Sequence, residues 1–136
     1  MEASFDRKKL IWPVALAALI VTASSFSHVP TPGFRGSDKL VHFCVYALLA
    51  TLICRVGRTW RSAVVAVLIV SAFGVTDELH QRFVPGRSPE IADWLADTLG
   101  ATCAVLLYAG SAAYRQMLEY RPRFLSHGSA NERGSR

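Results

Sequence analysis

Four stretches of the chain are apolar around their whole circumference, and this feature restricts the fold more than any other. A helix of a soluble protein carries one apolar stripe and an opposite polar face, whereas a helix surrounded by lipid is apolar on all sides. The stretches without Asp, Glu, Lys or Arg are residues 10–26, 40–54, 62–76 and 98–114. The sequence therefore predicts an all-α integral membrane bundle of four transmembrane helices rather than a soluble four-helix protein.

Positive charge is concentrated in alternate connections between these stretches. Of the 15 Lys and Arg residues, 11 lie before the first stretch, between the second and third, or after the fourth. Basic segments stay on the cytoplasmic side of a membrane during insertion. We therefore expect a multi-pass protein with both termini in the cytoplasm. The basic groups then serve as topology determinants and contacts to membrane lipids, and no nucleic-acid partner is expected.

The boundaries of the expected segments follow from charge, proline and capping residues. Residues 1–9 form a short cytoplasmic lead, residues 10–119 the membrane domain and residues 120–136 a disordered basic cytoplasmic tail. Ser37 is expected to cap a second helix, and residues 61–82 to form a third. Ser88 is expected to cap a fourth helix that starts at Pro89 and continues to about Glu119.

The first stretch has a second interpretation. Its basic start, apolar middle and small residues near Ala23 are also typical of a secretory signal peptide. Cleavage there would leave three spans with unchanged orientation.

Ionisable residues gather at the less basic ends of three predicted helices. Many of them are four residues apart, so they share one helix face. These sets are Asp38, His42 and Tyr46; Asp77 and Gln81; and Asp93 and Asp97. Below the last pair, small residues at Ala96, Gly100 and Ala104 would let another helix approach closely.

The depth of these residues in the membrane suggests that they face one another. Asp77 lies 16 residues beyond Arg61, or about 24 Å of helix, against a hydrocarbon core of about 30 Å. A carboxylate just below the outer interface is costly unless it is paired or hydrated. We therefore expect an outward-facing pocket of acids and histidine.

Three segments, residues 38–46, 76–87 and 93–100, resemble the three motifs of the VanZ-like family, in the same order. The resemblance covers about residues 36–108. It departs from the family at Asp97, where asparagine is usual, so the charge of the site differs here. The site candidates that it implies are Asp38, His42, Tyr46, Asp77, Glu78, Gln81, Pro85, Gly86, Arg87, Asp93, Asp97 and Gly100.

The resemblance also implies a place and a role. It implies a multi-helix protein of the bacterial cell envelope, located in the cytoplasmic (inner) membrane. The family's named member is associated with low-level resistance to teicoplanin, a lipid-bearing glycopeptide antibiotic. The expected partners are therefore membrane lipids and a lipid-linked or glycopeptide ligand.

The residues leave several functions open. In the first, the pocket binds a polar head group without catalysis, with Arg87 pairing with a phosphate or carboxylate and Gln81 hydrogen-bonding it. In another, the polar network only locks the helices together, as in a non-catalytic membrane scaffold. An oligomer is compatible with either.

A third function is a metal-assisted envelope hydrolase or transferase. His42 is the candidate general base, oriented by Asp38, and Glu78 is a further catalytic candidate. No cofactor motif is evident, but Asp77, Glu78 and Asp93 are candidate ligands of a divalent cation.

Overall fold

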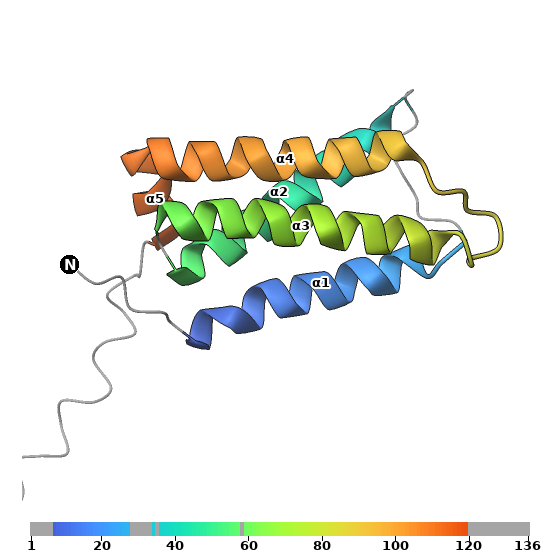
Figure 1. Cartoon of the computed structure of the whole chain (residues 1–136), viewed down its shortest axis with the longest axis horizontal. Coiled ribbons are helices and arrows are strands. Elements are labelled where there is room, and N and C mark those ends of the chain that lie inside the picture. The colour runs from blue at the N-terminus through green and yellow to red at the C-terminus, as the bar shows by residue number, and fades with distance from the viewer. Residues whose placement is uncertain (1–6, 28–33, 35, 58, 120–136) are drawn as a thin grey trace, which may run out of the picture.

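The computed structural model describes residues 7–27, 34, 36–57 and 59–119, and over these residues the fold is all-α (Figure 1). The predicted lead up to residue 6 and the predicted tail from residue 120 lie outside the described residues. The elements, in chain order, are a 3-10 turn η1 (Arg7–Leu10), α1 (Ile11–Ser24), α2 (Ser37–Gly57), α3 (Trp60–Gln81), α4 (Ile91–Gly110) and α5 (Ala112–Glu119).

Three of the described helices are long and apolar enough to cross a membrane. They are α2, α3 and α4, with 21, 22 and 20 residues. At 1.5 Å per residue each is about 30–33 Å long, which matches the hydrocarbon core. Helix α1 has 14 residues, or about 21 Å, so it does not reach that length by itself. The four-span topology with both termini inside therefore stays a prediction.

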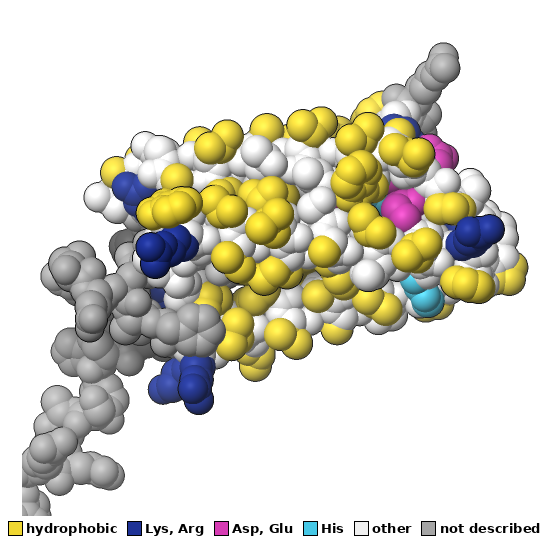
Figure 2. Space-filling model, viewed as in Figure 1, with side chains coloured by type: hydrophobic (Ala, Val, Ile, Leu, Met, Phe, Trp, Pro, Cys, Tyr) yellow, Lys and Arg dark blue, Asp and Glu magenta, His cyan; other side chains and the backbone are white. Residues whose placement is uncertain are grey.

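The outer surface of the bundle is apolar along its length. Leu68, Leu99 and Leu106 are among the large apolar side chains that point outward and are more than half exposed. Figure 2 shows hydrophobic side chains spread over the middle of the visible face, with charged side chains near its two ends. Exposed apolar area on this scale suits lipid rather than water.

The interior is narrow because small residues let α2 and α4 approach closely. A Cβ atom added at Gly100 of α4 would overlap the backbone of Phe43 in α2. Ala50 and Ala101 are completely buried in the same region. The predicted close approach at the small residues of α4 is therefore confirmed at Gly100.

The predicted start of the fourth helix is wrong. Helix α4 begins at Ile91, and its N-cap is Glu90 rather than Ser88. The Glu90 N–H donates a 2.7 Å hydrogen bond to Glu78 Oε2 on α3. Glu90 makes this bond with an extended backbone (φ −123°, ψ 120°), so the chain enters the helix only after Glu90.

The predicted end of that helix, at about Glu119, is also wrong. Ser111 has an extended backbone (φ −106°, ψ 110°) and separates α4 from the short α5. The Ser111 hydroxyl accepts a hydrogen bond from the Tyr114 N–H, which caps α5. Arg115 Nη1 donates to the carbonyls of Tyr108 and Ala109, so the last carbonyls of α4 have partners despite the break.

Helix α5 closes the basic end of the bundle. Its Glu119 accepts hydrogen bonds from Lys9 Nζ at 3.1 Å, Arg55 Nε at 3.2 Å and Tyr108 Oη at 3.3 Å. Partial burial alone would raise the pKa of Glu119, but the bonds from Lys9 and Arg55 outweigh it and lower that pKa. The contact ties η1, α2 and α5 together at the end remote from the acids.

Replacing Gly100 by alanine should weaken the bundle, because the new methyl group would meet the backbone of Phe43, which cannot rotate away. We expect a loss of about 1–3 kcal/mol in the free energy of unfolding, measured in detergent micelles. Gly110→Ala is the matched control, since its Cβ would meet no atom within 4 Å. Equal stability of the two variants would contradict the close α2–α4 contact.

A candidate polar site at one end of the bundle

The predicted convergence of polar residues from three helices is present. Asp77, Glu78 and Gln81 lie in the last turns of α3, while His42 and Asp97 lie in the first turns of α2 and α4. All three helix ends meet beside the connection of residues 82–90, on the right of Figure 1. Asp77, Glu78, Gln81, Asp93 and Asp97 are all buried.

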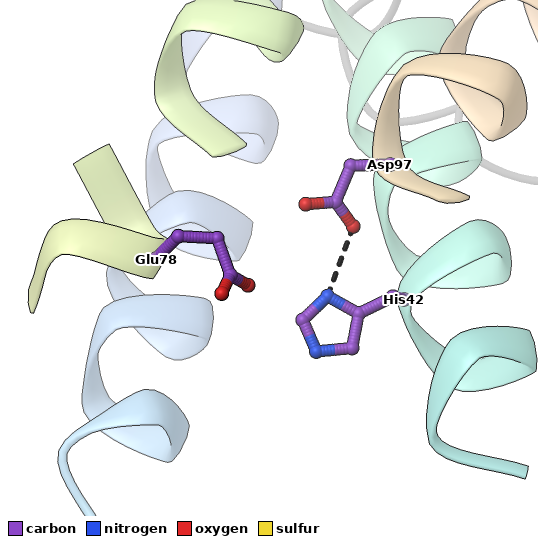
Figure 3. Close-up of side chains that lie close together, drawn as sticks. All are labelled: His42, Glu78 and Asp97. Carbon is purple, nitrogen blue, oxygen red and sulfur yellow. Dashed lines mark hydrogen bonds and ion pairs between the residues drawn. The ribbon is translucent and has the colours of Figure 1, made fainter. Parts of the chain in front are cut away.

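His42 and Asp97 form the central contact of this site. His42 Nδ1 lies 2.9 Å from Asp97 Oδ1 (Figure 3), and an ionised Asp97 would accept this hydrogen bond from Nδ1–H. Asp97 is completely buried. Gly74 of α3 makes room for it, since a Cβ at that position would lie 2.9 Å from Asp97 Oδ2. A side chain at position 74 would therefore force the Asp97 carboxylate to shift.

Tyr46 and Gln81 hold the carboxylate of Asp77. The Tyr46 hydroxyl donates to Asp77 Oδ2 at 3.0 Å, and Gln81 Nε2 donates to the same oxygen at 3.1 Å. The Tyr46 ring also stacks on His42, with centroids 5.9 Å apart. The predicted pairing of Asp77 with Gln81 is thus confirmed, and Tyr46 links Asp77 to His42.

Asp38 is not the partner of His42, contrary to the expectation from the sequence. Its carboxylate accepts a 2.8 Å hydrogen bond from Lys39, which also reaches Glu90 at 2.8 Å and Asp93 at 3.0 Å. Lys39 therefore gathers three acids at the mouth of the site. The orienting carboxylate of His42 is Asp97 on another helix.

The connection between α3 and α4 adds a basic group to the site. Pro85 and Gly86 are exposed, and Gly86 has a positive φ of 80°, which favours glycine at this turn. The turn leads to Arg87, whose Nε is buried and has no hydrogen-bond partner among the described residues. Arg87 therefore brings a buried, unpartnered guanidinium nitrogen to the site.

Two cavities adjoin at this end of the bundle. The first, of about 230 Å³, is mostly polar and is lined by Asp38, Val41, His42, Gln81, Gly86, Arg87, Ser88, Glu90 and Asp93. The second, of about 100 Å³, is mostly apolar and is lined by Ile20, Ala23, Ser24, Val41, His42, Val45, Tyr46, Asp77 and Arg87. Val41, His42 and Arg87 line both, so the polar cavity and the apolar cleft beside α1 are neighbours that share these side chains.

The site also contains two groups of residues of the kind that bind metal ions. One consists of His42, Glu78 and Asp97, and the other of Asp38, Glu90 and Asp93. The metal candidates from the sequence are divided between them: Glu78 belongs to the first group, Asp93 to the second and Asp77 to neither.

Sequence reasoning missed three contributors to the site. Lys39 follows Asp38 directly, and its role as a bridge depends on α2 and α4 being adjacent. Glu90 lies inside the helix that the sequence predicts from Pro89, whereas in the structure it precedes α4 and its N–H donates to Glu78. The sequence around Gly74 does not indicate a role for this glycine, because that role depends on Asp97, which is 23 residues away in the chain.

Tyr46→Phe should destabilise the protein, because Asp77 would keep only the Gln81 bond on a buried carboxylate. We expect a loss of about 1.5–3 kcal/mol in the free energy of unfolding in detergent. Tyr114→Phe is the control, since within the described residues no hydrogen bond is made by its hydroxyl. If both variants unfold alike, the bond between Tyr46 and Asp77 does not stabilise the site.

Comparison with known protein families gives one match. The model of the VanZ/LLP1 family matches residues 4–113, which include all three motifs and most of the polar site. No curated protein and no solved structure matches the chain. The match extends over more than half of the chain, and the apolar helices are of membrane-spanning length. The chain therefore belongs to the VanZ/LLP1 family and is a membrane protein of the VanZ type.

Proposed function

We propose that this protein binds an amphipathic ligand of the bacterial cell envelope at the outer face of the cytoplasmic membrane. The proposal includes a multi-pass topology with both termini in the cytoplasm. One observation carries it: a polar cavity and an apolar cleft adjoin and share Val41, His42 and Arg87. A molecule with a polar head and an acyl chain suits such a pair of cavities.

The polar cavity offers donors and acceptors to a head group. The unpartnered Nε of Arg87 suits a phosphate or carboxylate oxygen. The same cavity also contains negative charge, from the carboxylates of Asp38, Glu90 and Asp93. The single ammonium group of Lys39 neutralises only part of that charge. A head group that carries both an anionic and a cationic or hydroxyl group therefore fits better than a purely anionic one.

The apolar cleft lies between α1 and α2. Ile20 and Ala23 of α1 form one wall, and Val41 and Val45 of α2 form the other. The outward side of α1 carries exposed apolar residues such as Leu19, so the helix borders lipid. An acyl chain could enter this cleft from the bilayer without crossing a polar surface.

Teicoplanin is a suitable probe because it combines a polar peptide with an acyl chain. The resemblance of the three motifs to those of the VanZ-like family supports proposing a role in teicoplanin resistance for this chain. We propose that ligand binding at the two adjoining cavities underlies such a role here.

A metal-assisted hydrolase or transferase is the second candidate. It is favoured by the 2.9 Å contact between His42 and Asp97, because a histidine oriented by a carboxylate can act as a general base. In the scaffold alternative, the same contact would serve only to hold α2 against α4.

The test compares drug susceptibility of cells that contain equal membrane levels of each protein. Ala23→Phe fills the apolar cleft, and Arg87→Gln removes the cationic group that lines both cavities. Ala18→Phe is the matched control, because Ala18 lies exposed on the same helix and lines neither cavity. We expect wild type and Ala18→Phe to raise teicoplanin tolerance, and the other two variants to lose most of that increase.

The same cells are tested with a glycopeptide that lacks an acyl chain, against which no variant should differ. Wild-type cells no more tolerant of teicoplanin than empty cells would remove the link to this drug. Full tolerance in both Ala23→Phe and Arg87→Gln would overturn ligand binding at the cavities and favour the scaffold.

A further inference from the structure

We propose that His42, Glu78 and Asp97 form a binding site for one divalent transition-metal cation, with Zn²⁺ as the representative ion. One potential ligand atom from each residue lies within 4.8 Å of those of the other two. Two ligands on opposite sides of one zinc ion are about 4.2 Å apart at most. Figure 3 shows Glu78 on α3 pointing toward the His42–Asp97 pair, so small side-chain rotations would complete the site.

Unpartnered oxygen atoms give independent support for a cation. Asp97 is 0% exposed and Glu78 is 7% exposed, yet among the residues that the structure describes no hydrogen-bond partner reaches the buried Asp97 Oδ2 or Glu78 Oε1. Asp77 directly precedes Glu78, and its Oδ1 is likewise buried without a hydrogen-bond partner among the described residues. A buried carboxylate oxygen without a partner is costly, and a bound cation would remove that cost.

The charge balance points in the same direction. Among the described residues, no ion pair joins a lysine or arginine to Asp77, Glu78 or Asp97. Within the described residues, Asp97 has an ion-pair contact with His42 alone. The imidazole of His42 carries at most one positive charge. Acids at this depth in a membrane need compensation, and a dication supplies it.

The second group of acids does not need a metal in the same way. Lys39 Nζ lies within 3.0 Å of oxygen atoms of Asp38, Glu90 and Asp93, so an ammonium group already occupies the centre of that group. Asp38 and Glu90 are also partly exposed to solvent. The proposed site is therefore the deeper of the two.

The donor atoms indicate the class of metal. Calcium and magnesium prefer shells made of oxygen alone, whereas an imidazole with two carboxylates suits zinc and its neighbours in the first transition series. Three protein ligands leave at least one position for water or a ligand. Because His42 also lines the polar cavity, that position would be reached from the cavity.

This inference does not depend on the proposed ligand. Ala23→Phe and Arg87→Gln change the two cavities but leave all three metal ligands in place. Metal binding that survives in both variants, together with loss of drug tolerance, would support the two proposals separately.

The experiment measures metal in the purified full chain, which carries a tag without histidine and is held in detergent. After chelation and reloading with Zn²⁺, elemental analysis should find about one zinc per chain. Asp97→Asn and Glu78→Gln should each weaken zinc binding at least tenfold in a competition titration. Glu119→Gln, an acid-to-amide change at the opposite end, is the control and should bind like wild type.

A further variant guards against misfolding of the ligand variants. Gly74→Ala keeps all three ligands but displaces Asp97, because the new Cβ would lie 2.9 Å from its Oδ2. Loading with Co²⁺ should give visible absorption bands of a nitrogen and oxygen site in wild type, altered in Gly74→Ala. Absence of zinc from the folded wild type would overturn the proposal. Equal zinc binding in wild type, Asp97→Asn and Glu78→Gln would also overturn it and identify the metal as adventitious.

Discussion

The contact between α2 and α4 at Gly100 is the constraint on which the polar site depends. Gly100 lies against the backbone of Phe43, the residue after His42, and one turn of α4 before it is Asp97. Holding these two backbones together therefore places the imidazole against the carboxylate, 2.9 Å apart. Gly74 on α3 leaves space for the Asp97 carboxylate. The three helices can therefore pack around Asp97 because positions 74 and 100 have no side chain.

Much of this arrangement follows from the sequence, because both lipid solvation and burial of charge are strong constraints. The apolar stretches predicted the helices, and spacing by four residues predicted that Asp38, His42 and Tyr46 would share a face of α2. The choice of partners was not predictable, because it depends on how helices rotate against one another. His42 therefore pairs with Asp97 rather than Asp38, and Lys39 joins acids from two helices. The break at Ser111 was missed because the surrounding residues are compatible with a continuous helix.

The two proposals assign different roles to the acids near Lys39 and to those near His42. The outer acids around Lys39 set the charge of the cavity mouth, where a head group would enter. In the proposed metal site, the inner residues His42, Glu78 and Asp97 would hold a cation below that mouth. A metal at this depth would also fix the relative positions of α2, α3 and α4, and so would combine a structural effect with a site open to ligand.

The most direct measurement asks whether the polar end of the bundle faces the outside of the cell. Ser88 lines the polar cavity and is exposed, while Ala112 is exposed at the opposite end. In chains whose native Cys44, Cys54 and Cys103 are replaced, a cysteine is placed at one position or the other and treated with a membrane-impermeant maleimide. We expect labelling of Ser88→Cys at the outer surface of the cytoplasmic membrane, and of Ala112→Cys only after that membrane is opened. The reverse pattern would contradict it.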